Sequence, residues 1–204
     1  MDGVFIYWFG WILWVIITFF CNKTKTRFWN ALLLLLLFIL LPRTLHISDT
    51  SIHVVYIIGT IYLFRLIAKE PSYNLGHSFV GAITIAAAYG GFQMMLIFDP
   101  VVEYMDSRWM TGLVVSVVSF FLTTTFKHRL LIALIGLSQG ELLTGIVNQH
   151  HLYMDYSIGS FYFFDIVAIV CFLYSVVWTL SQLSAQLGKF VMREPKTNEL
   201  KQSS

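Results

Sequence analysis

Residues 130–147, LLIALIGLSQGELLTGIV, decide the class of this fold because they are apolar along almost their whole length. As an α-helix these 18 residues rise about 27 Å, close to the roughly 30 Å hydrocarbon core of a bilayer. The run carries Gln139 and Glu141, and an acid in such surroundings is costly and marks a site of interest. The stretch therefore predicts a transmembrane helix with one buried carboxyl group.

The composition of the whole chain agrees with this interpretation. Of 204 residues, 57% are apolar and only 12% are charged, whereas a soluble domain carries about 25% charged residues. Two cysteines, Cys21 and Cys171, lie in separate apolar runs and form no disulfide framework. The composition excludes an ordinary soluble globular protein, a disordered chain and a disulfide scaffold. It predicts an all-α, polytopic membrane protein.

Six further apolar runs are long enough, or nearly long enough, to cross a bilayer. They cover residues 3–21, 28–41, 52–68, 78–98, 109–126 and 158–180. The run 28–41 is short, and it could extend through Pro42 to Ile47 with Arg43 reaching toward the headgroups. Together with 130–147, these runs predict a bundle of seven transmembrane helices in residues 1–180.

Basic residues divide unevenly between alternate loops of this seven-helix arrangement. Eleven of the 13 lie on one side, and only Arg43 and Arg108 lie on the other. Because basic residues in short loops stay in the cytoplasm, this bias predicts an outside amino terminus and an inside carboxyl terminus. We therefore expect a multi-pass protein of the cell membrane.

The chain changes character after residue 180. Leu183, Leu187 and Phe190 recur at helical spacing among polar residues, which predicts an amphipathic helix at the inner interface over residues 181–193. Residues 194–204 are polar without periodicity, and we expect a disordered tail there.

Small residues recur at four-residue spacing in three of the predicted helices. They are Ala82, Ala86 and Gly90; Gly112 and Ser116; and Gly136, Gly140 and Thr144. Helices in lipid approach closely through such residues, so we expect the fourth, fifth and sixth helices to pack tightly.

Two acids are expected inside the bundle. We expect Glu141 close to the middle of the membrane and Asp165 in its outer half. If their helices are antiparallel neighbours, the two carboxyl groups lie at similar depths, within reach of each other, His53 or Gln93. The candidate polar cavity is lined by Glu141, Asp165, His53, Gln93, Gln139 and Asn148. Two interpretations remain open: a proton, cation or small-solute site, and a hydrogen-bonded network that fixes helix packing.

Several kinds of chemistry leave no pattern in the sequence. The histidines and acids of the outer side reach no zinc spacing, and there is no phosphate-binding Gly-rich loop and no Gly-x-Ser-x-Gly motif. We predict no catalytic residues, no metal, no cofactor and no nucleic-acid partner. The expected role is non-enzymatic, through membrane lipids and membrane-protein partners of the cell envelope. The alternatives are a small-solute or ion transporter and an intramembrane enzyme, and the sequence leaves the oligomeric state open.

The beginning of the chain combines an aromatic segment, FIYWFGWILW at residues 5–14, with a basic turn, NKTKTR at residues 22–27. With the chain length and the helix count, this pattern resembles the YphA-like family of uncharacterised multi-pass membrane proteins from Bacillus-type bacteria. The resemblance implies a bacterial plasma membrane location. It carries no activity, substrate or catalytic residue over to this chain.

Overall fold

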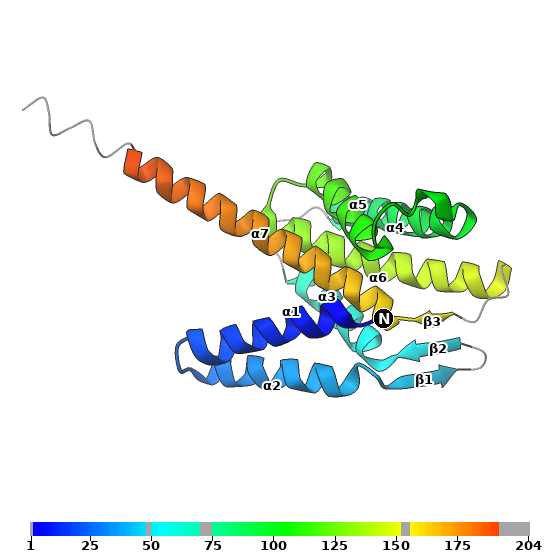
Figure 1. Cartoon of the computed structure of the whole chain (residues 1–204), viewed down its shortest axis with the longest axis horizontal. Helices are drawn as coiled ribbons and strands as arrows, with labels where there is room; N and C mark the ends of the chain where they lie inside the picture. The colour runs from blue at the N-terminus through cyan, green and yellow to red at the C-terminus, as the bar shows by residue number, and fades with distance from the viewer. Residues whose placement is uncertain (1, 48–49, 70–74, 152–155, 192–204) are drawn as a thin grey trace, which may run out of the picture.

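The computed structural model describes residues 2–47, 50–69, 75–151 and 156–191, and these are mostly helical (Figure 1). Its α-helices are α1 (Val4–Val15), α2 (Lys25–Leu40), α3 (Val54–Ala68), α4 (Leu75–Phe98), α5 (Ser107–Leu122), α6 (Phe126–His151) and α7 (Phe161–Val191). A π-helical segment, Ile16–Phe20, prolongs α1, and a short 3-10 helix, Pro100–Val102, precedes α5. Each α-helix corresponds to one of the predicted apolar runs.

A three-stranded sheet departs from the all-α prediction. β1 (Thr44–Ile47) pairs antiparallel with β2 (Thr50–His53), which pairs parallel with β3 (Ser157–Ile158). Of the alternatives for the second helix, its extension to Ile47 does not occur, because α2 ends at Leu40 and the chain enters β1 at Thr44. Strand pairing also shortens the third and seventh helices at their starts, since β2 and β3 take residues that the sequence assigned to them.

Within the residues that the structure describes, three helices are long and apolar enough to cross a membrane: Gly76–Phe98, Phe126–Gln149 and Phe161–Gly188. The apolar helices Val4–Phe20, Val54–Ala68 and Ser107–Leu122 are shorter. A helix of 16 residues rises about 24 Å, so shorter helices need a locally thinned bilayer or flanking groups that reach the interface.

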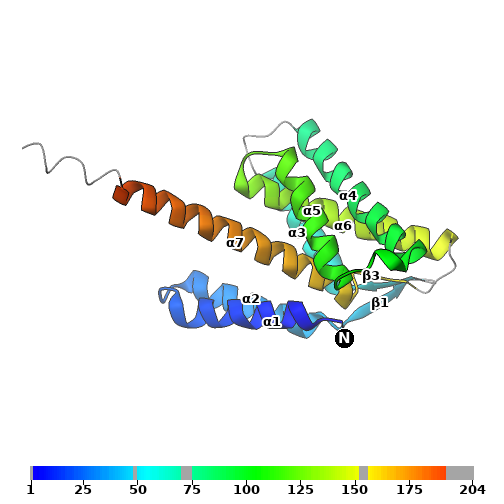
Figure 2. The ribbon, with the colours of Figure 1, turned by 45° about the horizontal axis from the view of Figure 1, so that its top comes forward.

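α7 runs without a break through the segment predicted as a separate amphipathic helix, up to Val191. The predicted end of that segment, residues 192–193, and the tail 194–204 lie outside the described residues. In Figures 1 and 2, α7 lies between the α1–α2 hairpin and the group formed by α4, α5 and α6. Its later turns project beyond both.

The predicted close packing of the fourth and sixth helices is confirmed. A Cβ atom at Gly136 would lie 2.5 Å from Ile85 Cβ, and one at Gly140 would lie 3.0 Å from the Ala86 carbonyl oxygen. These glycines therefore let the backbones of α4 and α6 approach each other. Gly112 of α5 instead faces α7, where its Cβ would lie 2.8 Å from Ile169 Cγ2, although α5 also contacts α4 and α6.

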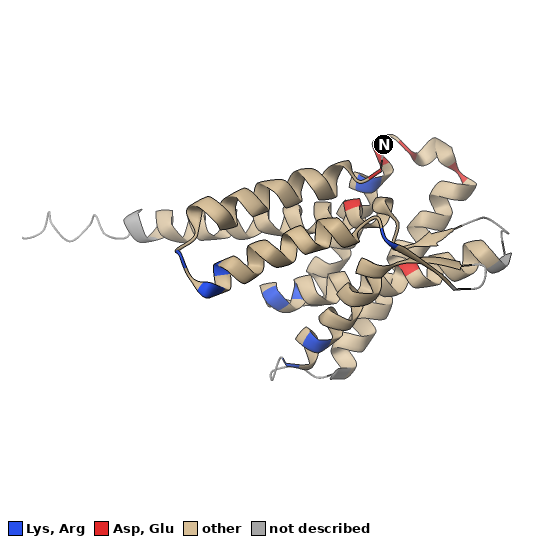
Figure 3. Cartoon of the chain, turned by 90° about the horizontal axis from the view of Figure 1, so that it is seen from below, with Lys and Arg blue, Asp and Glu red and all other residues tan. Residues whose placement is uncertain are grey.

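Charged side chains are unevenly distributed along the long direction of the molecule. Figure 3 shows most of the described Lys and Arg toward the end with the α1–α2 turn, while the described Asp and Glu lie toward the end that holds the sheet. We call these the basic end and the acidic end. The separation has the same sense as the loop asymmetry in the sequence.

Candidate functional site

Glu141 lies near the middle of α6 and is fully buried. Its Oε2 atom accepts hydrogen bonds from the Tyr89 hydroxyl at 2.6 Å and the Tyr156 hydroxyl at 2.9 Å. Its Oε1 atom accepts from the Gly159 backbone N–H at 3.0 Å. One carboxyl group thus joins α4, α6 and the link that precedes α7, and this satisfies three donors in an apolar interior.

The link before α7 is shaped to bring its backbone against Glu141. Gly159 has a φ of +71°, in the left-handed region that glycine adopts without cost, and a Cβ there would overlap the Tyr56 side chain, whose Cβ atom is nearest. Tyr56 in turn donates its hydroxyl to the Ser138 carbonyl at 2.5 Å. Burial, and then the Glu141 charge, raise the pKa of the Tyr156 phenol. Tyr156 therefore keeps its proton and remains a hydrogen-bond donor.

Asp165 lies in the second turn of α7 and is also fully buried. Its Oδ2 atom accepts from the Gly3 backbone N–H at 2.8 Å and from Arg108 Nη1 at 2.8 Å, and its Oδ1 atom accepts from the Ile6 N–H at 2.9 Å. Gly3 precedes α1, whose first N–H groups have no partners within the helix. Asp165 therefore caps α1 from another helix, where the helix dipole also favours a negative charge.

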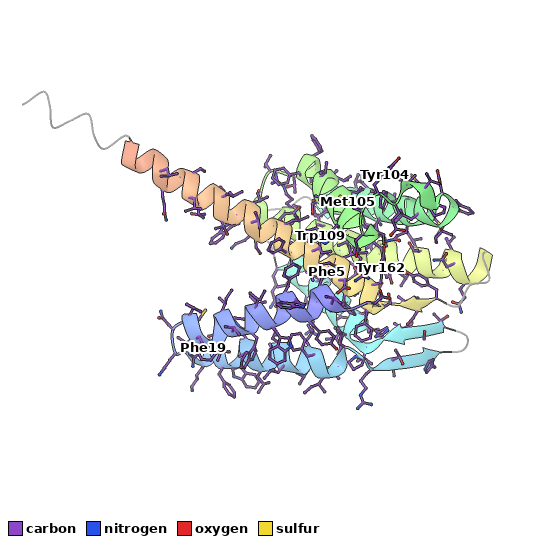
Figure 4. The ribbon with its side chains drawn as sticks, viewed as in Figure 1. Phe5, Phe19, Tyr104, Met105, Trp109 and Tyr162 are labelled. Atoms are coloured by element: carbon purple, nitrogen blue, oxygen red, sulfur yellow. The ribbon has the colours of Figure 1, made fainter. Side chains whose placement is uncertain are left out.

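Arg108 occupies the centre of an ionic and aromatic cluster at the acidic end. Besides Asp165, it contacts Asp2 Oδ1 at 3.0 Å and Asp106 Oδ1 at 3.5 Å. Its guanidinium lies 5.7 Å from the centroid of the Phe5 ring and 5.8 Å from that of Tyr162, within the range of cation–π attraction. Figure 4 shows Phe5, Trp109 and Tyr162 where α1, α5 and α7 meet.

The other four predicted site residues lie in separate contacts. His53 is buried, and its Nδ1 is 2.9 Å from the Leu41 carbonyl oxygen. Gln93 is buried, and its Nε2 lies 3.4 Å from both Thr111 Oγ1 and the Tyr162 hydroxyl. Gln139 is half-buried. Asn148 is buried, and among the described residues its Oδ1 has no hydrogen-bond partner.

The structure therefore divides the predicted site into two centres. Among the described residues, no hydrogen bond joins either carboxyl group to His53, to Gln93 or to the other acid. Whether these groups handle a solute stays a prediction.

Sequence reasoning missed Arg108, Tyr89 and Tyr156 as partners of the two acids. Arg108 carried a usable signal, because it is one of two basic residues on a side otherwise rich in acids. A cation that breaks the charge bias near a buried acid is a candidate ion-pair partner. Tyr89 follows Ala86 by three residues on α4 and so lies near the face that packs on α6.

Comparison with known proteins places this architecture in a family. A family model described as YphA-like integral membrane protein matches residues 2–201. The chain belongs to this family. It is 24% identical to a protein of Bacillus subtilis (strain 168) named Uncharacterized protein YphA, in an alignment covering 96% of this chain and 97% of that protein. No solved structure matches the chain.

Membership in the YphA-like family confirms the resemblance inferred from the aromatic opening and the basic turn, and it identifies an integral membrane protein. The family description names no reaction and no ligand.

Proposed function

We propose that this protein is a multi-pass, non-enzymatic protein of the cell membrane that acts through membrane partners in the cell envelope. The observation that supports the proposal is that both buried carboxyl groups form hydrogen bonds that link several helices. Asp165 joins α7 to α1 and α5, and Glu141 joins α6 to α4 and the link before α7. Groups so engaged stabilise a scaffold.

The surface that we assign to partners is the hairpin of α1 and α2. Neither helix contains a fully buried residue, and neither does the π-helical segment between them. Large side chains are exposed on it, among them Trp8 at 67%, Trp29 at 59% and Ile39 at 68%. Within a membrane such a surface meets lipid tails or the apolar face of another helix.

A photoreactive benzoylphenylalanine placed at Trp29 tests this assignment in living cells. The matched control places the same group at Val80, which is 61% exposed on α4. We expect a discrete protein adduct from position 29 and only lipid adducts from position 80. Equal adducts from both positions, or none from position 29, would count against a partner surface on the hairpin.

We further propose seven crossings with the amino terminus outside. The support is the agreement between the loop charges and the separation of charge in Figure 3. Cysteine labelling with a membrane-impermeant maleimide tests it in a background where Cys21 and Cys171 are replaced. Cysteines at Glu103 and Asp106 should react in intact cells, whereas one at Lys23 should react only after permeabilisation. The reverse pattern would overturn the orientation.

One observation favours transport of a small solute or ion as a second candidate function. Thr144 and Asn148 follow Glu141 on one face of α6 at helical spacing. Both are buried, and Thr144 Oγ1 and Asn148 Oδ1 have no hydrogen-bond partner among the described residues. Such oxygens can accept from water or coordinate a cation. Transport predicts that purified protein in vesicles carries a proton or cation flux that Glu141→Gln abolishes while insertion remains normal.

A further inference from the structure

A groove of about 350 Å³ lies between α5 and α7, on the part of both helices nearer the basic end. Its α5 wall includes Leu113, Val117 and Phe120, and its α7 wall includes Leu173, Tyr174 and Val177. The volume falls within the roughly 300–1,000 Å³ that ligand sites occupy. The groove is therefore large enough for a flexible apolar segment.

The two helices that form the groove contact each other beside it. The helices meet at Gly112, which lies against Ile169 and Val170. Farther along, the hydroxyl of buried Ser119 is 2.5 Å from that of Tyr174. The buried Oγ atom of Ser116, another lining residue, has no hydrogen-bond partner among the described residues. A groove lined almost entirely by apolar side chains suits a hydrocarbon chain better than a polar solute.

The side chain of Arg129 lies at the basic end of this groove. The Arg129 guanidinium lies 3.6 Å from the centroid of the Phe120 ring, which lines the groove. Its Nε and Nη2 atoms donate to the Thr123 carbonyl oxygen at 2.9 and 2.6 Å. Within the described parts of the chain, no carboxylate lies within 4.0 Å of it. Of a guanidinium's five N–H donors, those not used on Thr123 can bind an anion.

We propose that the groove holds an acyl chain of an anionic phospholipid whose phosphate binds Arg129. The chain would lie along Phe120 and Tyr174, and the headgroup would meet the guanidinium at the basic end. Arginine and phosphate form short, charge-assisted and often bidentate hydrogen bonds. Charge complementarity favours a lipid over a neutral helix as the occupant, because a helix would leave Arg129 without an anion.

Photo-crosslinking with full-length protein in phosphatidylcholine vesicles tests the proposal. The probe is a phosphatidylglycerol with a diazirine on its acyl chain, and the same label on phosphatidylcholine is the comparison. Crosslinks mapped by mass spectrometry should concentrate in residues 113–121 and 173–177 for phosphatidylglycerol. Because one basic residue near a membrane surface is worth about 1 kcal/mol toward anionic lipid, Arg129→Gln should reduce these crosslinks about fivefold.

Four variants separate lipid binding from folding. Arg129→Lys keeps the charge, so it should retain most of the preference even if the Thr123 contact weakens. Arg65→Gln removes an exposed charge from α3 at the same end and should change nothing. Val117→Trp should block the groove, whereas Val80→Trp, at an exposed position of α4 outside the groove, should not.

Equal crosslinking of the two lipids, or full labelling of Arg129→Gln or Val117→Trp, would overturn the proposal. Crosslinks between two copies of the chain across the groove would also overturn it, because a second copy would then be the occupant.

Discussion

The two buried carboxyl groups face opposite electrostatic settings within one bundle. Asp165 has a cation at 2.8 Å and two backbone N–H groups. Glu141 has two tyrosine hydroxyls and one backbone N–H. The first is held by an ion pair and backbone donors, and the second by neutral donors alone.

The difference shows how a membrane protein can keep acids in its interior in two ways. An ion pair depends on both charges, since the loss of one leaves the other desolvated. A carboxyl group held by neutral donors depends on hydrogen-bond geometry, which an amide can largely reproduce. Substitutions at the two centres should therefore differ in their effect on the free energy of unfolding, measured in mixed detergent micelles.

Removing the cation should have the largest effect. Arg108→Gln leaves Asp165 buried without its guanidinium, and breaking a buried pair in this way costs about 3–5 kcal/mol. We expect an unfolding free energy lower by at least about 3 kcal/mol. Arg43→Gln is the control, because it removes an exposed basic residue from the same side. A loss at Arg108 no larger than at Arg43 would show that the pair contributes little.

Overfilling the close contact between α4 and α6, near the Glu141 centre, should have the next largest effect. Gly136→Ala places a methyl group against Ile85 and the Ala82 carbonyl, and overpacking of this kind costs about 1–3 kcal/mol. Gly91→Ala is a matched change on α4 with open space around its Cβ. It should stabilise the protein by up to about 1 kcal/mol through helix propensity. Similar effects from both changes would refute the close approach of α4 and α6.

Asp165→Asn should destabilise by about 2 kcal/mol, because the N–H₂ group replaces one carboxylate oxygen. Either the Ile6 N–H, or the Gly3 N–H together with the guanidinium, then loses its acceptor. Arg108 keeps Asp2 and Asp106 nearby, so this loss should stay below that of Arg108→Gln. Amide exchange should also rise in the first turn of α1. Unchanged exchange there would contradict the capping role of Asp165.

Glu141→Gln should have the smallest effect, below about 1 kcal/mol, since the amide oxygen still accepts and a tyrosine hydroxyl can turn to accept from the new N–H₂. Normal accumulation together with this small loss is the expected result. A larger loss than that of Asp165→Asn would reverse the contrast between the two centres.

The helices were predictable because a helix that crosses a bilayer needs a long run of apolar residues, and such runs are visible in the sequence. The close approach of Gly136 and Gly140 to α4 followed from their spacing. The sheet was not predictable in the same way. Residues 44–53 are partly apolar and short, so periodicity alone cannot separate a strand from a helix end.

The sequence predicted the two acids of the site, but it did not predict the side chains that pair with them. Burial and charge identify Glu141 and Asp165 from sequence alone. Arg108 lies 57 positions before Asp165, and Tyr89 lies 52 before Glu141. Contacts over such separations are set by how whole helices pack, which no local pattern records.

A double-mutant cycle on Arg108 and Asp165 tests the central claim, that an ion pair binds α1, α5 and α7 together. Arg108→Gln, Asp165→Asn and the double variant are unfolded under identical conditions. If the pair is as close and buried as described, the two losses are strongly non-additive, and the double variant is more stable than Arg108→Gln alone, because no buried charge is left without a partner. Losses that simply add would contradict the ion pair as the joint of these three helices.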